Sequence, residues 1–145
     1  SYLVDIFVKQ IKAVLLKEKM YKKFNNLQDV YKNTLIQIYR QPTKSLKMEM
    51  SNSVAAYLTA IRAIDRSELS DIGYIFDYFL QPWVVMSIER LIEENKKYIK
   101  KLEKAIPKIK DKDEQNELKE NLKVCRANLE YLTTVDESNN FNEWE

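Results

Sequence analysis

Histidine is absent from this chain of 145 residues, and cysteine and glycine occur once each. Without histidine there is no imidazole base for Ser-His-Asp or Cys-His chemistry, and the commonest ligand of zinc and non-haem iron sites is missing. The single glycine, Gly73, cannot build a P-loop or a dinucleotide-binding loop, because both need several glycines beside the phosphates. We therefore expect no catalytic residues, no metal and no cofactor, and a protein that is not an enzyme.

Other scarce features bear on the compartment. The one cysteine, Cys125, cannot form a disulfide within the chain, which argues against a secreted disulfide scaffold and favours a reducing compartment. No apolar run approaches the roughly 20 residues of a membrane-spanning helix, and the first residues lack the pattern of a signal peptide. We therefore expect a soluble intracellular protein. With 24 Lys and Arg against 22 Asp and Glu, the net charge of +2 identifies no partner.

The spacing of apolar residues, in a chain with three prolines and one glycine, favours helix almost throughout. Apolar residues recur at helical spacing in four segments, namely 2–24, 27–41, about 45–65 and about 68–80. The last segment is apolar on almost all sides, which is typical of a helix that is buried or lies at an interface. Ser67 is its expected N-cap, and Pro82 suits the first turn of the helix that follows.

Two seams of apolar residues predict a long antiparallel hairpin of helix 83–106 with helix 113–135. In each seam the spacing alternates between three and four residues, as in a coiled coil. Residues that would pair across the turn keep a nearly constant sum of residue numbers through five layers, from Leu102 with Leu118 to Ile88 with Leu132. Asn95 then faces Cys125, and we interpret this polar layer as one that sets the register.

The predicted fold is therefore all-α. We expect a single domain over residues 1–135, a bundle of about five helices that includes the coiled-coil-like hairpin, and an acidic tail over residues 136–145. A hairpin that opened would exchange between two chains, so the same layers would also allow a homodimer.

The first helix has two contrasting faces. Its apolar residues lie on one side, where they suit a bundle core: Leu3, Val4, Phe7, Val8, Ile11, Val14 and Leu15. A basic stripe of Lys9, Lys12, Lys19 and Lys23 lies opposite, within an arc of about 80°. Such a stripe fits a solvated face, an acidic protein partner, a phosphate backbone or anionic lipid. The stripe has no arginine to read guanine edges, which argues against sequence-specific nucleic-acid binding.

Aromatic residues supply the other candidate contacts. Tyr74, Tyr78 and Trp83 belong to a run of five aromatics in ten residues, and we predict that they lie near a surface groove and contact a partner. The alternative is that the run forms the core of the domain. Phe141 and Trp144 stand in the acidic tail, which is typical of a peptide that docks into a basic groove with an apolar floor.

These features predict a non-enzymatic protein that binds another macromolecule through helical surfaces, as an adaptor, an assembly subunit or a small regulatory or inhibitory factor. A protein is the partner we expect. The alternative is an electrostatic nucleic-acid-binding protein that uses its basic N-terminal helices. The third hypothesis is peripheral association with an anionic membrane through the first helix.

Overall fold

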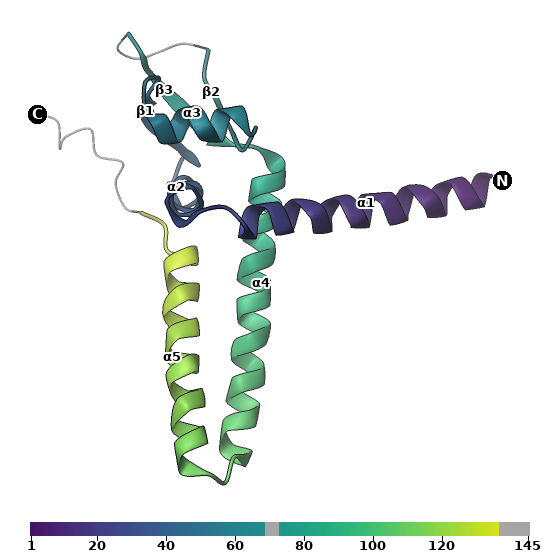
Figure 1. The fold of residues 1–145 in the computed structure, drawn as a ribbon, viewed down its shortest axis with the longest axis vertical. Helices are drawn as coiled ribbons and strands as arrows, with labels where there is room; N and C mark the ends of the chain where they lie inside the picture. The colour runs from purple at the N-terminus through teal and green to yellow at the C-terminus, as the bar shows by residue number, and fades with distance from the viewer. Residues whose placement is uncertain (69–72, 137–145) are drawn as a thin grey trace, which may run out of the picture.

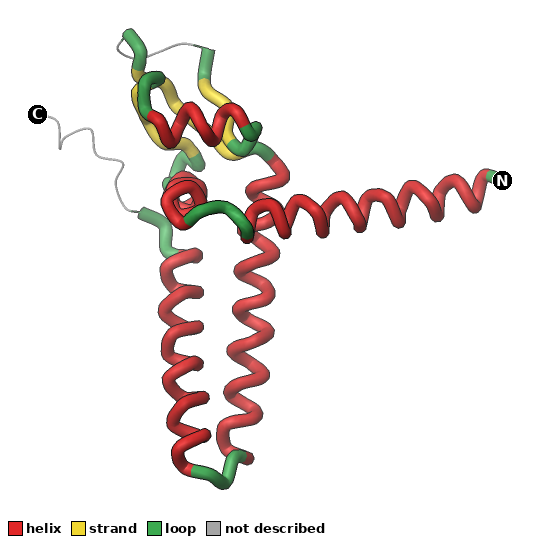
Figure 2. Tube along the Cα trace, viewed as in Figure 1, coloured by secondary structure: helices red, strands yellow, loops and turns green. Residues whose placement is uncertain are grey.

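The structure is a computed structural model, and it describes residues 1–68 and 73–136. Within these residues the protein is mostly helical and includes a small three-stranded sheet. Figure 1 shows three parts: a helix that stands out to one side, a helical hairpin, and a unit of helices and strands above the open end of the hairpin. Figure 2 separates the helices from the strands by colour.

The first two helices begin and end close to where the sequence predicts. Helix α1 spans Tyr2–Asn25, and the Ser1 side chain accepts a hydrogen bond from the Val4 amide at its start. Helix α2 spans Asp29–Arg40 and ends before Pro42, whose ring disfavours helical backbone in the residue before it. Residues 26–28 form the break between the two helices, and Asn25 is the last residue of α1.

The expectation of an all-α fold is wrong, because the middle of the chain forms a sheet. The expected helix over 45–65 is strand β1 (Ser45–Glu49), helix α3 (Ser53–Ala60) and strand β2 (Ile64–Arg66). The expected helix over 68–80 contains strand β3 (Ile75–Leu80), and residues 69–72 lie outside the described part. The strand order is β1-β3-β2, and both pairings are antiparallel.

Strand β3 is the central strand of the sheet and is apolar apart from Asp77; Tyr78 is buried, whereas Phe79 is 41% exposed. A short apolar run of this kind fits a buried strand as well as a buried helix, so its periodicity cannot separate the two. Gly73 introduces the strand with a φ of +58°, a left-handed conformation that glycine adopts without a steric penalty. Asn52 divides the preceding segment, since its side chain caps α3 by accepting from the amides of Val54 and Ala55.

The helical hairpin lies close to its predicted position. Helix α4 spans Pro82–Ala105 with proline in its first turn, and a 3₁₀ helix (Ile106–Lys108) and a short loop lead to α5 (Lys112–Thr133). The two long helices run antiparallel and side by side within one chain (Figure 1). Coiled-coil geometry, with the five paired layers, stays a prediction.

The buried apolar residues form two clusters. The main cluster joins α2, α3 and the sheet to the start of α4 and the end of α5, and it includes Phe24, Leu35 and Tyr78. The second cluster lies toward the turn of the hairpin and consists of Ile99, Leu102, Ile106 and Leu122. Leu129 packs against both clusters, so the hairpin carries one continuous apolar seam with two centres.

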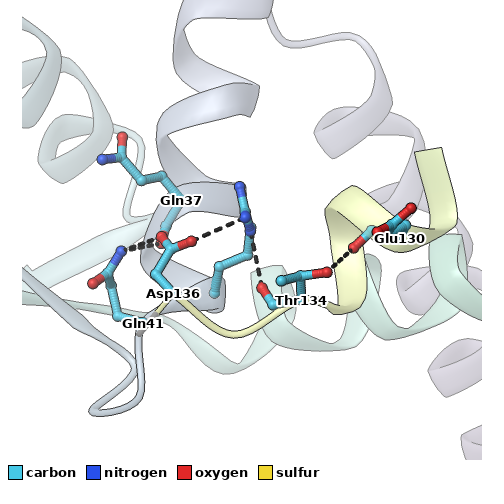
Figure 3. Close-up of polar contacts among 6 residues, drawn as sticks. Gln37, Gln41, Glu130, Thr134 and Asp136 are labelled. Carbon is cyan, nitrogen blue, oxygen red and sulfur yellow. Dashed lines mark hydrogen bonds and ion pairs between the residues drawn. The ribbon is translucent and has the colours of Figure 1, made fainter. Parts of the chain in front are cut away.

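A polar clasp joins the end of α5 to the end of α2 (Figure 3). Asp136 forms a 2.9 Å ion pair with Arg40 and accepts a 2.8 Å hydrogen bond from the Gln41 amide group. Arg40 also donates to the Thr134 carbonyl at 3.0 Å, and its backbone carbonyl accepts from the Asp136 amide at 2.9 Å. Gln41 is only 3% exposed, so the clasp satisfies a buried polar side chain.

Two phenylalanines of α1 test how this helix is held. Phe24 is fully buried and Phe7 is 62% exposed. Phe24→Ala should lower the free energy of unfolding by roughly 3–5 kcal/mol, because it leaves a cavity in the main cluster. Phe7→Ala should change it by less than about 0.5 kcal/mol in dilute protein. Urea unfolding of both variants measures the difference, and equal losses would contradict the exposed position of Phe7.

Candidate functional site

The N-terminal part of α1 places a row of apolar side chains in solvent. We call Leu3, Val4, Phe7, Val8, Ile11, Val14 and Leu15 the apolar stripe; their exposed fractions run from 40% for Val8 to 77% for Leu3. At about 100° per residue, the seven residues of the stripe span an arc of roughly 140° around the helix. No polar residue among positions 1–17 falls within this arc. Monomeric proteins rarely expose so long an apolar patch, and such patches mark interaction sites. The sequence placed these residues in the core, and the structure places them outside it.

The stripe is exposed because α1 packs on the body through a different face and a different part of its length. Only Tyr21 and Phe24 of this helix are buried, and both lie near its C-terminal end. The face of α1 that shares a hollow with α4 is centred roughly 140° around the helix from the stripe, and its residues are Ala13, Leu16, Lys17, Met20 and Tyr21. Figure 1 shows the result, with the N-terminal turns of α1 clear of the hairpin.

A polar clamp fixes the angle at which α1 leaves the body. Arg90 on α4 pairs with Glu18 of α1 at 2.6 Å and with Glu94 on its own helix at 3.2 Å. The Tyr21 hydroxyl donates to Glu94 at 2.8 Å, and the Arg90 guanidinium lies over the Tyr21 ring. The hydrogen bond from Arg90 holds the pKa of Glu18 below its ordinary value, whereas burial raises the pKa of Tyr21. Glu18 occupies the helix face of the stripe one turn beyond Leu15, so the clamp begins where the stripe ends.

An open hollow of about 430 Å³ lies where α1 meets α4. Its lining is mainly apolar, with Leu16 and Met20 on one side and Trp83 and Met86 on the other. The ionic side chains at its edge are Lys17 and Arg90. Because Arg90 already pairs with two carboxylates, the hollow offers apolar contact more than charge.

The three aromatic residues predicted to contact a partner lie in different environments in the structure. Tyr78 is 2% exposed and belongs to the main cluster, so it is not available to a partner. Tyr74 is 62% exposed, just before β3. Side chains alternate between the two faces of a strand, and a helical reading of the same run therefore assigned Tyr78 to the wrong environment. Trp83 is half-buried and donates from its indole nitrogen to the Arg62 carbonyl at 2.8 Å.

The basic stripe is only partly free. Lys9, Lys12 and Lys19 are exposed along α1, and no other described residue forms an ion pair with them. Lys23 lies over the Trp83 ring, 5.0 Å from its centroid, and donates to the Ile61 carbonyl at 3.5 Å. Two predicted contact residues, Lys23 and Trp83, are therefore brought together, and their contact attaches α1 to the body. Phe141 and Trp144 lie outside the described residues.

Among residues 1–68 and 73–136, no group of three or more Cys, Asp or Glu side chains is arranged to hold a metal ion. In the same ranges, no helix combines the length and the hydropathy needed to cross a membrane. The apolar stripe is the surface feature that stands out.

Comparison of the chain with protein-family models, with curated protein sequences and with solved structures finds no match.

The clamp predicts a specific pH dependence. The pKa of Glu18 lies below its ordinary 4.5 in the folded protein, so the stability from its charged form is present above pH 4.5 and is lost as the pH falls through the lowered pKa. We expect Glu18→Gln to be less stable than wild type at neutral pH, with a difference that shrinks in acid. Urea unfolding over a pH series measures this. Glu120→Gln, which removes an exposed carboxyl on α5, is the control, and an unchanging Glu18→Gln difference would contradict the clamp.

Proposed function

We propose that this protein works by binding another protein through the apolar stripe of α1, as an adaptor or an assembly subunit and not as an enzyme. The observation that carries the proposal is the exposure of all seven stripe residues on one face of a continuous helix. An amphipathic helix that presents anchors at this spacing is a common means of recognising a groove or another helix. The polar clamp supports the same role, because it holds the stripe away from the body.

Nucleic-acid binding is the alternative, and it has weaker support. Lys9, Lys12 and Lys19 form an exposed row that could follow a phosphate backbone. Lys23 is occupied at Trp83, which shortens the row. Binding by lysine alone would leave the apolar stripe in water, so it gives no reason for the most unusual surface of the protein.

Association with a membrane surface is the third hypothesis. The apolar stripe could enter the interface of a bilayer, as amphipathic helices do. Lys9 lies nearly opposite the centre of the stripe, so in that orientation its amine would point toward water and away from the lipid headgroups. A basic polar face is common in such membrane helices, so the vesicle test below, and not the distribution of charge, separates this hypothesis from a protein partner.

The hairpin has a supporting role in this proposal. We propose that α4 and α5 pair as an antiparallel coiled coil with the five predicted layers. Four of these layers are supported because both members belong to, or pack against, the same apolar cluster, as Ile99 and Leu122 do. The layer of Asn95 with Cys125 is half-buried on both sides, and we interpret it as a register-setting pair.

A photoreactive amino acid at Leu15 tests the proposal, because this position lies within the stripe. Irradiation in an extract of the source cell should give a discrete adduct with a second protein chain. The same probe at Lys9, on the opposite side of the helix, should give little. Phe7→Glu should reduce the adduct by roughly thirtyfold, as the loss of a binding hot spot does, whereas Lys9→Glu should leave it unchanged. Loss through Lys9→Glu, with retention in Phe7→Glu, would contradict the proposal.

The two other hypotheses predict different results with the purified chain. A nucleic-acid-binding protein should bind a generic duplex at low salt and lose affinity steeply as salt rises, and Lys9→Glu should weaken it. A membrane-binding protein should sediment with vesicles that contain anionic lipid, and Phe7→Glu should release it. We expect neither behaviour.

A further inference from the structure

The apolar stripe has a spacing that suits a second copy of itself. Val4, Phe7, Ile11 and Val14 are separated alternately by three and four residues, which is the seam of a two-stranded coiled coil. Glu18 takes the next seam position and turns to Arg90, so the seam is confined to the part of α1 that leaves the body.

The stripe is also nearly symmetric about residue 9. A two-fold interface requires that residue i of one copy contacts residue j of the other, and j contacts i. In an antiparallel pair centred on residue 9, residue i of one copy lies beside residue 18 − i of the other. Three pairs of stripe residues then face each other: Leu3 with Leu15, Val4 with Val14, and Phe7 with Ile11. Only Val8 faces a polar residue, Gln10. An antiparallel pair of these helices would therefore bury six of the seven stripe residues of each copy against apolar residues of the other.

Charge and geometry favour the same pairing. Lys9, at the centre of symmetry, lies on the opposite side of the helix from the stripe, so the two copies of this lysine would point away from each other. No charged residue stands within the arc of the stripe before Glu18. A helix on the stripe would approach α1 roughly 140° around its axis from the residues that face α4, so it need not displace the body.

From these observations we infer that two copies of the chain associate through α1, antiparallel and in register about residue 9, with their bodies at opposite ends of the paired helices. The inference rests on the proposed function, since it identifies the protein bound by the stripe as a second copy of this chain.

The first test measures the mass of the purified full chain by sedimentation equilibrium over a wide range of concentrations. We expect a monomer–dimer equilibrium. Ile11→Glu should raise the dimer dissociation constant by at least about a hundredfold, because the symmetric interface contains the change twice. Glutamate is a good helix former, so α1 should persist, and circular dichroism checks this. Lys9→Glu is the matched control on the opposite face and should leave the constant unchanged.

The second test determines the register. In a Cys125→Ser background, chains with Phe7→Cys are mixed with chains with Ile11→Cys and oxidised with glutathione disulfide. Antiparallel pairing about residue 9 brings position 7 of one copy beside position 11 of the other, so the mixed disulfide should exceed both homodimers. A parallel pair would instead favour the two disulfides between like chains, 7 with 7 and 11 with 11.

The possible results are distinct. A dimer that resists Ile11→Glu, for example one formed by exchange of the hairpin, overturns the inference, as does a dimer with a parallel register. A chain that stays monomeric at all concentrations also overturns it, yet the proposed function stands if the Leu15 probe still joins a different protein. A monomer whose probe gives no adduct overturns both. A stripe-dependent dimer with the mixed disulfide supports both.

Discussion

Helix α1 is attached to the body near its C-terminal end, by the burial of Phe24 and Tyr21 and by the ion pair between Glu18 and Arg90. This attachment leaves the N-terminal turns of the helix in solvent. Helix α1 has 24 residues and is about 36 Å long, and these contacts hold only its last two turns. Two buried aromatic rings are enough to fix that end, since each removes a large apolar area from water. The remaining turns stay helical through their own backbone hydrogen bonds and keep their apolar residues outside.

The elements that could be predicted from the sequence are those with long periodic patterns. The hairpin could be predicted because its apolar seams are long and because Pro82 suits the first turn of a helix. The sheet could not, since β1, β2 and β3 have three to six residues each and the pairing that stabilises them joins distant segments. The scarcity of glycine and proline favoured helix there, and long-range pairing outweighed that local preference.

The sequence also could not predict that the apolar face of α1 lies in solvent. The apolar residues of α1 were identified correctly as one face of a helix, and the basic stripe was placed correctly on the other side. An apolar face requires a partner, but the pattern does not say whether that partner is the same chain or another. The ion pair of Arg90 with Glu18 settles the exit angle, and it joins residues 72 positions apart. A local pattern around Glu18 carries no signal of that contact.

The two apolar clusters of the hairpin affect how the protein opens locally. The cluster near the turn shares few residues with the main cluster, so the ends of α4 and α5 can separate locally while the sheet and α2 stay intact. Backbone amides around Leu102 and Leu122 should then exchange with solvent through a smaller opening than those around Ile88 and Leu132. The clasp at Asp136 holds the other end of α5 to α2, away from the turn.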